Sequence, residues 1–156
     1  MSQNFQPPAP YSYTEAPAPA PARSGNLGLA IAAAAVTALI AGAAYGGLMG
    51  GIEYQIGYAA AGVGLLVGLV AARLGGRNPI LPALSAVLTL LGVYVGYLLA
   101  EAILISKTFP ISVTELLTSR IADVHQSFLD NFDPISVLFF ALGGYAAFQT
   151  ARKAGN

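Results

Sequence analysis

Four long apolar stretches occupy most of this chain, and they decide in which solvent it can fold. They cover about residues 27–50, 56–74, 80–105 and 134–151 of the 156. The hydrocarbon core of a bilayer is about 30 Å thick and takes about 20 helical residues to cross. Because backbone amides find no water inside lipid, stretches of this kind fold as helices. The sequence therefore predicts an all-α protein, a bundle of four transmembrane helices within residues 27–151.

The scarcity of charge supports a membrane location and excludes several classes of function. Charged residues make up 9% of the chain, whereas soluble domains carry about 25%. The formal net charge is zero, so no overall field attracts nucleic acid, and we expect no nucleic-acid partner. The chain has no cysteine and one histidine, which argues against a zinc site. We predict no metal site and no cofactor.

Residues 1–26 differ in composition from the apolar stretch that follows them. They include an alternating Ala-Pro run over residues 16–22, and proline keeps such a run extended because it lacks the amide donor that a helix needs. We expect a disordered cytoplasmic tail, serving as a soluble spacer or as a docking segment for a proline-recognising partner. No short basic region directly precedes the first apolar stretch, so we interpret that stretch as a retained anchor and not as a signal peptide.

The segment over about residues 112–131 is too polar to span a membrane. Its apolar residues recur at one helical face, and they are Leu117, Ile121, Val124 and Phe128. Ser112 followed by Glu115 matches a capping box, which marks a helix start. We therefore expect one amphipathic helix that lies at the membrane interface, against lipid or against the bundle. Asp133 and Pro134 then provide the N-cap and first position of the last span.

The basic residues alternate along the chain in a way that predicts its orientation. With four crossings, five cations fall on one side of the membrane: Arg23, Arg73, Arg77, Arg152 and Lys153. The other side receives Glu53 and the more acidic segment 106–133. Because short cytoplasmic loops collect Lys and Arg, we expect both termini in the cytoplasm.

Each apolar stretch carries small residues at a spacing of three or four. They are Gly42, Gly46 and Gly50 in the first stretch, Gly57, Ala61, Gly64 and Gly68 in the second, Gly92 and Gly96 in the third, and Gly143 and Ala147 in the fourth. Lipid tails are as apolar as leucine, so membrane helices associate best where small residues let their backbones approach. We predict that these residues pack the helices together. A stripe that faced outward would instead make a homo-oligomer or bind a helix of a larger membrane complex.

Glu101 is the one charged residue well inside a predicted span, about one turn from its outer end. A charge at the bilayer centre costs at least about 2.5–3.5 kcal/mol, so such residues are candidates for an ion or proton pathway. Near the end of its helix, Glu101 could also reach water or pair with Lys107. Glu53 and Tyr54 in the first connection, together with His125, could join it in a polar pocket at the outer face.

The second and third stretches share a pattern with other proteins. A GxGxLVG core leads to an arginine and then to LLGxxxGxxL; the matching residues are Gly62, Gly64, Leu66, Val67, Gly68 and Arg73, then Leu90, Leu91, Gly92, Gly96 and Leu99. This hairpin resembles one found in small bacterial multi-pass membrane proteins of unknown function. The resemblance implies a bacterial origin, hence an inner (plasma) membrane location, and it implies no activity.

The sequence carries no Walker loop, nucleophile elbow or metalloprotease motif, so we expect no enzymatic activity and no catalytic residue. The first hypothesis is a protein that acts through helix packing as a scaffold, accessory subunit or homo-oligomer, with the lipid bilayer as its surroundings. The alternative is a small transporter or channel component that uses Glu101 and the polar groups of the outer face.

Overall fold

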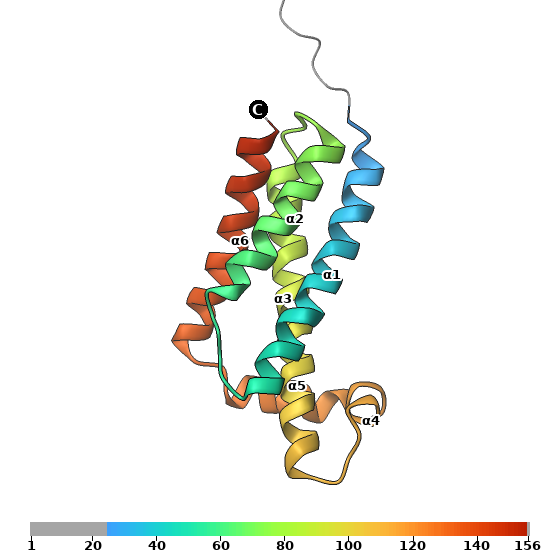
Figure 1. Cartoon of the computed structure of the whole chain (residues 1–156), viewed down its shortest axis with the longest axis vertical. Helices are drawn as coiled ribbons and strands as arrows, with labels where there is room; N and C mark the ends of the chain where they lie inside the picture. Colours follow the sequence, from blue (N-terminus) through green and yellow to red (C-terminus); the bar gives the residue numbers. More distant parts are fainter. Residues whose placement is uncertain (1–24, 156) are drawn as a thin grey trace, which may run out of the picture.

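The computed structural model describes residues 25–155, which form six helices and no strand (Figure 1). Four long helices build a bundle, namely α1 (Leu27–Ile52), α2 (Ala59–Gly75), α3 (Leu81–Thr108) and α6 (Pro134–Ala154). Two short helices, α4 (Val113–Thr118) and α5 (Ile121–Asp130), lie beside the end of α3. The all-α class predicted from the sequence is confirmed for this part of the chain. The tail predicted for residues 1–26 falls almost wholly outside the described residues.

The four long helices pack as two parallel pairs that run in opposite directions (Figure 1). Helices α1 and α3 form one close pair, and α2 and α6 form the other. Across the pairs, α2 also contacts both α1 and α3, and α3 contacts α6. Consequently the start of α1, the α2–α3 turn and the end of α6 share one end of the bundle. The backbone N–H of Asn26 donates to the carbonyl of Leu74 there, at 2.9 Å.

Three of these helices, α1, α3 and α6, are long and apolar enough to cross a membrane. Helix α2 is apolar as well but has 17 residues, which at 1.5 Å per residue span about 25 Å, less than the hydrocarbon core. The span predicted from residue 56 begins as a helix only at Ala59, because residues 53–58 form a non-helical connection. Three apolar helices of this kind indicate a membrane-embedded protein.

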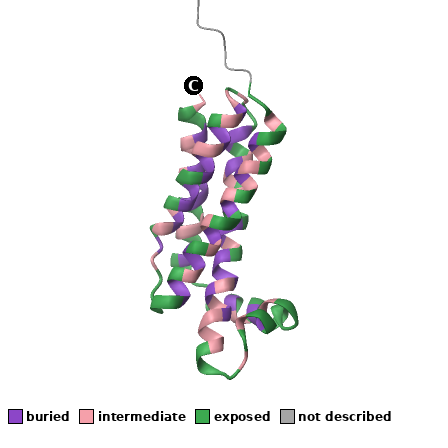
Figure 2. Ribbon diagram, turned by 45° about the vertical axis from the view of Figure 1, so that its right-hand side comes forward, coloured by how far each residue is buried: buried purple, intermediate pink, exposed green. Residues whose placement is uncertain are grey.

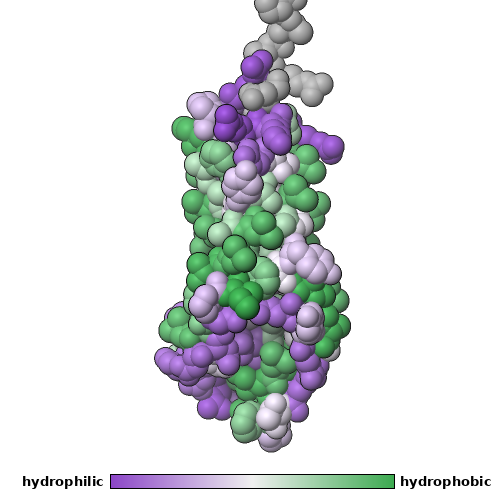
Figure 3. All heavy atoms as spheres, turned by 90° about the vertical axis from the view of Figure 1, so that its left-hand side faces the viewer, coloured by the Kyte–Doolittle hydropathy of each residue, from purple (hydrophilic) through white to green (hydrophobic). Residues whose placement is uncertain are grey.

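Small side chains make up much of the interior of the bundle, and many large apolar side chains lie on its outside. Figure 2 shows how buried and exposed residues alternate along each long helix. Ala30, Ala34 and Ala38 follow one face of α1 and are at most 2% exposed. The large residues that are about half exposed or more on the long helices include Leu29, Val36, Leu39, Ile40, Leu66, Val87, Leu91, Val137 and Leu138. In water this surface would aggregate, whereas in lipid it is fully solvated. Figure 3 shows this apolar band between two hydrophilic zones.

The single amphipathic helix expected over residues 112–131 is two helices, broken at Ser119 and Arg120. The predicted N-cap is present, since the backbone N–H of Glu115 donates to Ser112 Oγ at 3.2 Å. The backbone N–H groups of both Ser119 and Arg120 donate to the Glu115 carbonyl, which closes α4 after two turns. The break shifts the register, so Leu116 is buried in α4, and Val124 and Phe128 are buried in α5. Both helices pack against α3.

Helix α6 begins where the sequence predicts. Asp133 Oδ1 accepts a hydrogen bond from the backbone N–H of Ser136 and another from its hydroxyl, each at 2.8 Å. Pro134 occupies the first turn, where its missing N–H is not needed. The Ser136 backbone N–H, reinforced by its hydroxyl, holds the pKa of the Asp133 carboxyl below its ordinary value.

Candidate functional site

The predicted small residues of α1 and α3 lie against one another. A Cβ atom added at Gly42 or Gly46 would come within 3.0 Å of backbone atoms of Gly92 or Gly96, respectively. The converse also holds, because a Cβ at Gly92 or Gly96 would come equally close to the backbone of α1. Real Cβ atoms do not approach a backbone so closely, so this helix pair depends on the absence of side chains. At Gly50, the neighbouring atoms belong to Ala100 and Ile103.

The α2–α6 pair uses the same kind of contact. A Cβ at Gly64 would come within 3.0 Å of the Gly143 carbonyl, and one at Gly68 would come within 3.0 Å of the Ala147 carbonyl. Gly143 is buried against Ala60, and Ala147 is fully buried. The contact surface of α2 therefore runs through Ala60, Gly64 and Gly68.

Two residues predicted for that stripe lie elsewhere. Gly57 precedes α2 and sits beneath the ring of Phe139, which a Cβ atom would strike. Ala61 is half-buried, and its neighbour Ala60 is the residue that contacts α6. The expectation assumed helix from residue 56, and the later start of α2 accounts for the place of Gly57. Ala61 lies within α2, where the face that contacts α6 continues from Gly64 to Ala60, four residues earlier.

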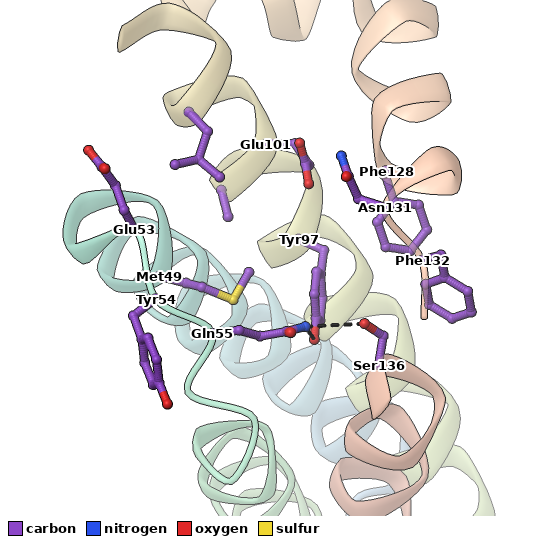
Figure 4. A pocket seen from close by; sticks show the side chains of 12 residues that line it. Met49, Glu53, Tyr54, Gln55, Tyr97, Glu101, Phe128, Asn131, Phe132 and Ser136 are labelled. Carbon is purple, nitrogen blue, oxygen red and sulfur yellow. Dashed lines mark hydrogen bonds between the residues drawn. The ribbon is translucent and has the colours of Figure 1, made fainter. Parts of the chain in front are cut away.

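A polar pocket of about 180 Å³ lies at the opposite end of the bundle from the α2–α3 turn (Figure 4). Its walls come from the end of α1, the α1–α2 connection, α3, α5 and the start of α6. Glu53, Tyr54 and Glu101 all line it, so three of the four polar residues singled out in the sequence share one cavity. His125 does not line this cavity, and its Nδ1 instead lies 2.9 Å from the hydroxyl of Tyr94.

Gln55 links three elements at this pocket, and the sequence reasoning did not single it out. Its Nε2 donates to Tyr97 Oη on α3 at 2.7 Å and to Ser136 Oγ on α6 at 3.1 Å (Figure 4). Ser136 donates in turn to Asp133. A glutamine beside an apolar stretch is the only hint of this role in the sequence. Its partners are 42 and 81 residues away along the chain, so the sequence does not identify them. The connection is largely exposed, with Gly57 as its one buried residue, and Glu53, Tyr54 and Gln55 line the pocket.

Glu101 lies deeper than expected. Helix α3 continues to Thr108, which places Glu101 about two turns from the end, at 3.6 residues per turn. Its Oε2 accepts a hydrogen bond from Ser127 Oγ of α5 at 3.1 Å. This contact ties the carboxylate to the helix that covers it.

The pairing of Glu101 with Lys107 is not formed. Lys107 Nζ lies 2.9 Å from Glu53 Oε1 and donates to the carbonyls of Gly50 and Gly51, each at 3.0 Å. Those carbonyls end α1, so the ammonium group caps a helix C-terminus, where the helix dipole favours a cation. Glu53 is the C-cap residue and has a φ of 57°, a left-handed conformation that is uncommon for residues other than glycine.

The pocket offers one partly buried carboxylate, amide and hydroxyl groups, and the aromatic rings of Tyr97, Phe128 and Phe132. Among residues 25–155, no three His, Asp or Glu side chains gather closely enough to hold a metal ion. Chemically, the arrangement suits binding of a cation or a polar group from the membrane surface. In comparisons with family models, curated proteins and solved structures, no significant match was found.

Proposed function

We propose that this protein is a non-enzymatic integral membrane protein that crosses the bacterial plasma membrane four times and works through helix packing, as a scaffold, accessory subunit or homo-oligomer. The observation that carries the proposal is the pairing of α1 with α3 and of α2 with α6 through side-chain-free contacts. Such contacts give a membrane bundle its rigidity. They also leave the bulky aliphatic faces pointing outward, where another membrane helix can pack.

The distribution of charge supports four crossings with both termini in the cytoplasm. We call the end with the α2–α3 turn the basic end, since it carries Arg73, Arg77, Arg152 and Lys153. We call the opposite end of the bundle, together with α4 and α5, the acidic end. Every Asp and Glu of the described residues lies there. Cytoplasmic loops collect Lys and Arg, so the basic end faces the cytoplasm. The non-helical connection before α2 supplies the length that its 17 residues lack.

Photo-crosslinking in native membranes tests the packing role. A photoreactive residue at Ile40 or Leu138, which are 66% and 63% exposed, should capture a second copy or another membrane protein as a discrete band. The matched control is Val93, which is 0% exposed and should capture nothing outside the chain. Lipid adducts alone at every outward position, with the protein remaining a monomer, would contradict the scaffold hypothesis.

One observation favours a second candidate, a small transporter or channel component. Glu53, Tyr54 and Glu101 line one cavity that reaches the acidic end, and membrane carboxylates commonly serve as ion or proton relays. Under this hypothesis Glu101→Gln abolishes an ion- or pH-dependent flux in proteoliposomes, while Glu115→Gln, which alters an exposed carboxylate away from the pocket, preserves it. Under the scaffold hypothesis the wild-type protein gives no flux above that of empty liposomes.

A further inference from the structure

A second cavity, of about 370 Å³, lies at the basic end. It opens between the α2–α3 turn, the first turn of α3 and the last two turns of α6. Arg77 and Asn78 line it from the turn, Arg152 lines it from α6, and Pro82 and Phe148 form apolar walls. This cavity is remote from the polar pocket with Glu101, and the packing role does not use it.

The cations around this cavity have no internal counter-ion among residues 25–155. The two ion pairs of that part of the chain, Lys107 with Glu53 and Arg120 with Asp123, both lie at the acidic end. Arg77 and Arg152 are exposed, so their guanidinium groups are free to bind an anion that arrives from outside. Figure 3 shows a hydrophilic zone at this end of the bundle, directly beside the apolar band.

Asn78 adds a further donor. Its Oδ1 accepts the backbone N–H of Ile80 at 3.0 Å, which leaves the amide NH2 group to donate. Two guanidinium groups and an amide supply donors in the number and geometry that phosphate oxygens accept, because arginine binds phosphate through paired N–H groups. The cavity is therefore chemically suited to a phosphate group.

We propose that this cavity binds the phosphate headgroup of an anionic phospholipid in the leaflet at the basic end. The apolar surroundings favour a lipid over a free phosphate, because Phe148 and Ile80, which are 37% and 55% exposed, give the acyl chains a surface to follow. Basic pockets between membrane helices at the cytoplasmic side are sites where acidic lipid headgroups bind. The proposal rests on the membrane location of the basic end and is independent of the scaffold role.

Native mass spectrometry of the full chain in detergent tests this site. Phosphatidylglycerol and phosphatidylcholine with identical acyl chains are added in turn, and the retained lipid is counted. We expect preferential retention of phosphatidylglycerol by the wild-type protein. Each of Arg77→Gln and Arg152→Gln should weaken this retention about fivefold, the contribution of one basic residue near an anionic surface. Arg120→Gln at the acidic end is the matched control and should leave it unchanged.

Equal retention of the two lipids by the wild-type protein would overturn the proposal, and this readout requires no variant to fold. The proposal would also be overturned if Arg120→Gln weakened the retention of phosphatidylglycerol as much as Arg77→Gln and Arg152→Gln do. The effect would then be one of overall charge. Inorganic phosphate distinguishes the two sources of the anion. If millimolar phosphate alone removes the bound phosphatidylglycerol, the site is one for free phosphate; retention of the lipid supports the headgroup site.

Discussion

Gly46 and Gly47 are neighbours in α1, yet a methyl group at the two positions meets opposite surroundings. At Gly46 it would collide with the backbone of Gly96, whereas at Gly47 nothing lies within 4 Å. We predict that Gly46→Ala destabilises the bundle by about 1–3 kcal/mol, the usual cost of overpacking. Gly47→Ala should change stability by less than about 0.5 kcal/mol. Thermal unfolding in detergent measures both, and equal effects would show that α1 and α3 do not meet at Gly46.

Lys107 caps the end of α1 by donating hydrogen bonds to the carbonyls of Gly50 and Gly51. We predict that Lys107→Met lowers stability by about 1 kcal/mol, since it removes charge-assisted hydrogen bonds to two helix-terminal carbonyls. Glu53→Gln removes only the ion pair with Lys107. The Glu53 side chain is 63% exposed, so we expect a smaller loss of stability than in Lys107→Met. A larger loss in Glu53→Gln, measured by the same unfolding experiment, would assign the stabilisation to the ion pair.

At the scale of the element, the cap of α6 should make stability depend on pH. Hydrogen bonds from Ser136 keep the pKa of Asp133 below its ordinary value near 3.8. A carboxyl whose pKa is lowered by folding stabilises the protein above that ordinary value, and this stabilisation is lost as the pH falls through the lowered pKa. Asn at this position keeps an uncharged acceptor at every pH.

We therefore predict that the melting temperature of the wild-type protein falls further than that of Asp133→Asn between about pH 5 and about pH 2. This window runs from just above the ordinary pKa of an aspartate to below it. Circular dichroism in a detergent stable to acid follows both proteins. Parallel pH curves would mean that the carboxylate charge contributes nothing to the start of α6.

The elements themselves followed from the sequence to different degrees. The helix starts at Ser112 and Asp133 could be predicted because caps are local, as each involves a residue three positions away. The break at Ser119 could not, because Ser and Arg do not forbid helix and the gain comes from burying Leu116 and Val124 against α3. The late start of α2 has a similar cause, since Gln55 bonds to Tyr97 and Ser136 in place of continuing a helix.

At the scale of the whole molecule, which helices pair is a tertiary property. The spacing of Gly42 and Gly46 indicates a contact surface but not its partner, and several arrangements would satisfy the four stripes. The structure pairs α1 with α3 and α2 with α6, helices that are not consecutive in the sequence. The sharing of one cavity by Glu53 and Glu101 depends on that arrangement, so the sequence could only raise it as a hypothesis.

The central claim is that the chain crosses the membrane four times with its basic end in the cytoplasm. Because the chain lacks cysteine, single cysteines can be labelled on intact cells with a membrane-impermeant maleimide. Exposed positions are available at both ends: Tyr54 and Ala122 at the acidic end, Pro79 and Ala154 at the basic end. The account predicts labelling of Tyr54→Cys and Ala122→Cys in intact cells, and of Pro79→Cys and Ala154→Cys only after permeabilisation. Labelling of Pro79→Cys in intact cells would contradict it, because the α2–α3 turn of the basic end would then lie outside the cytoplasm.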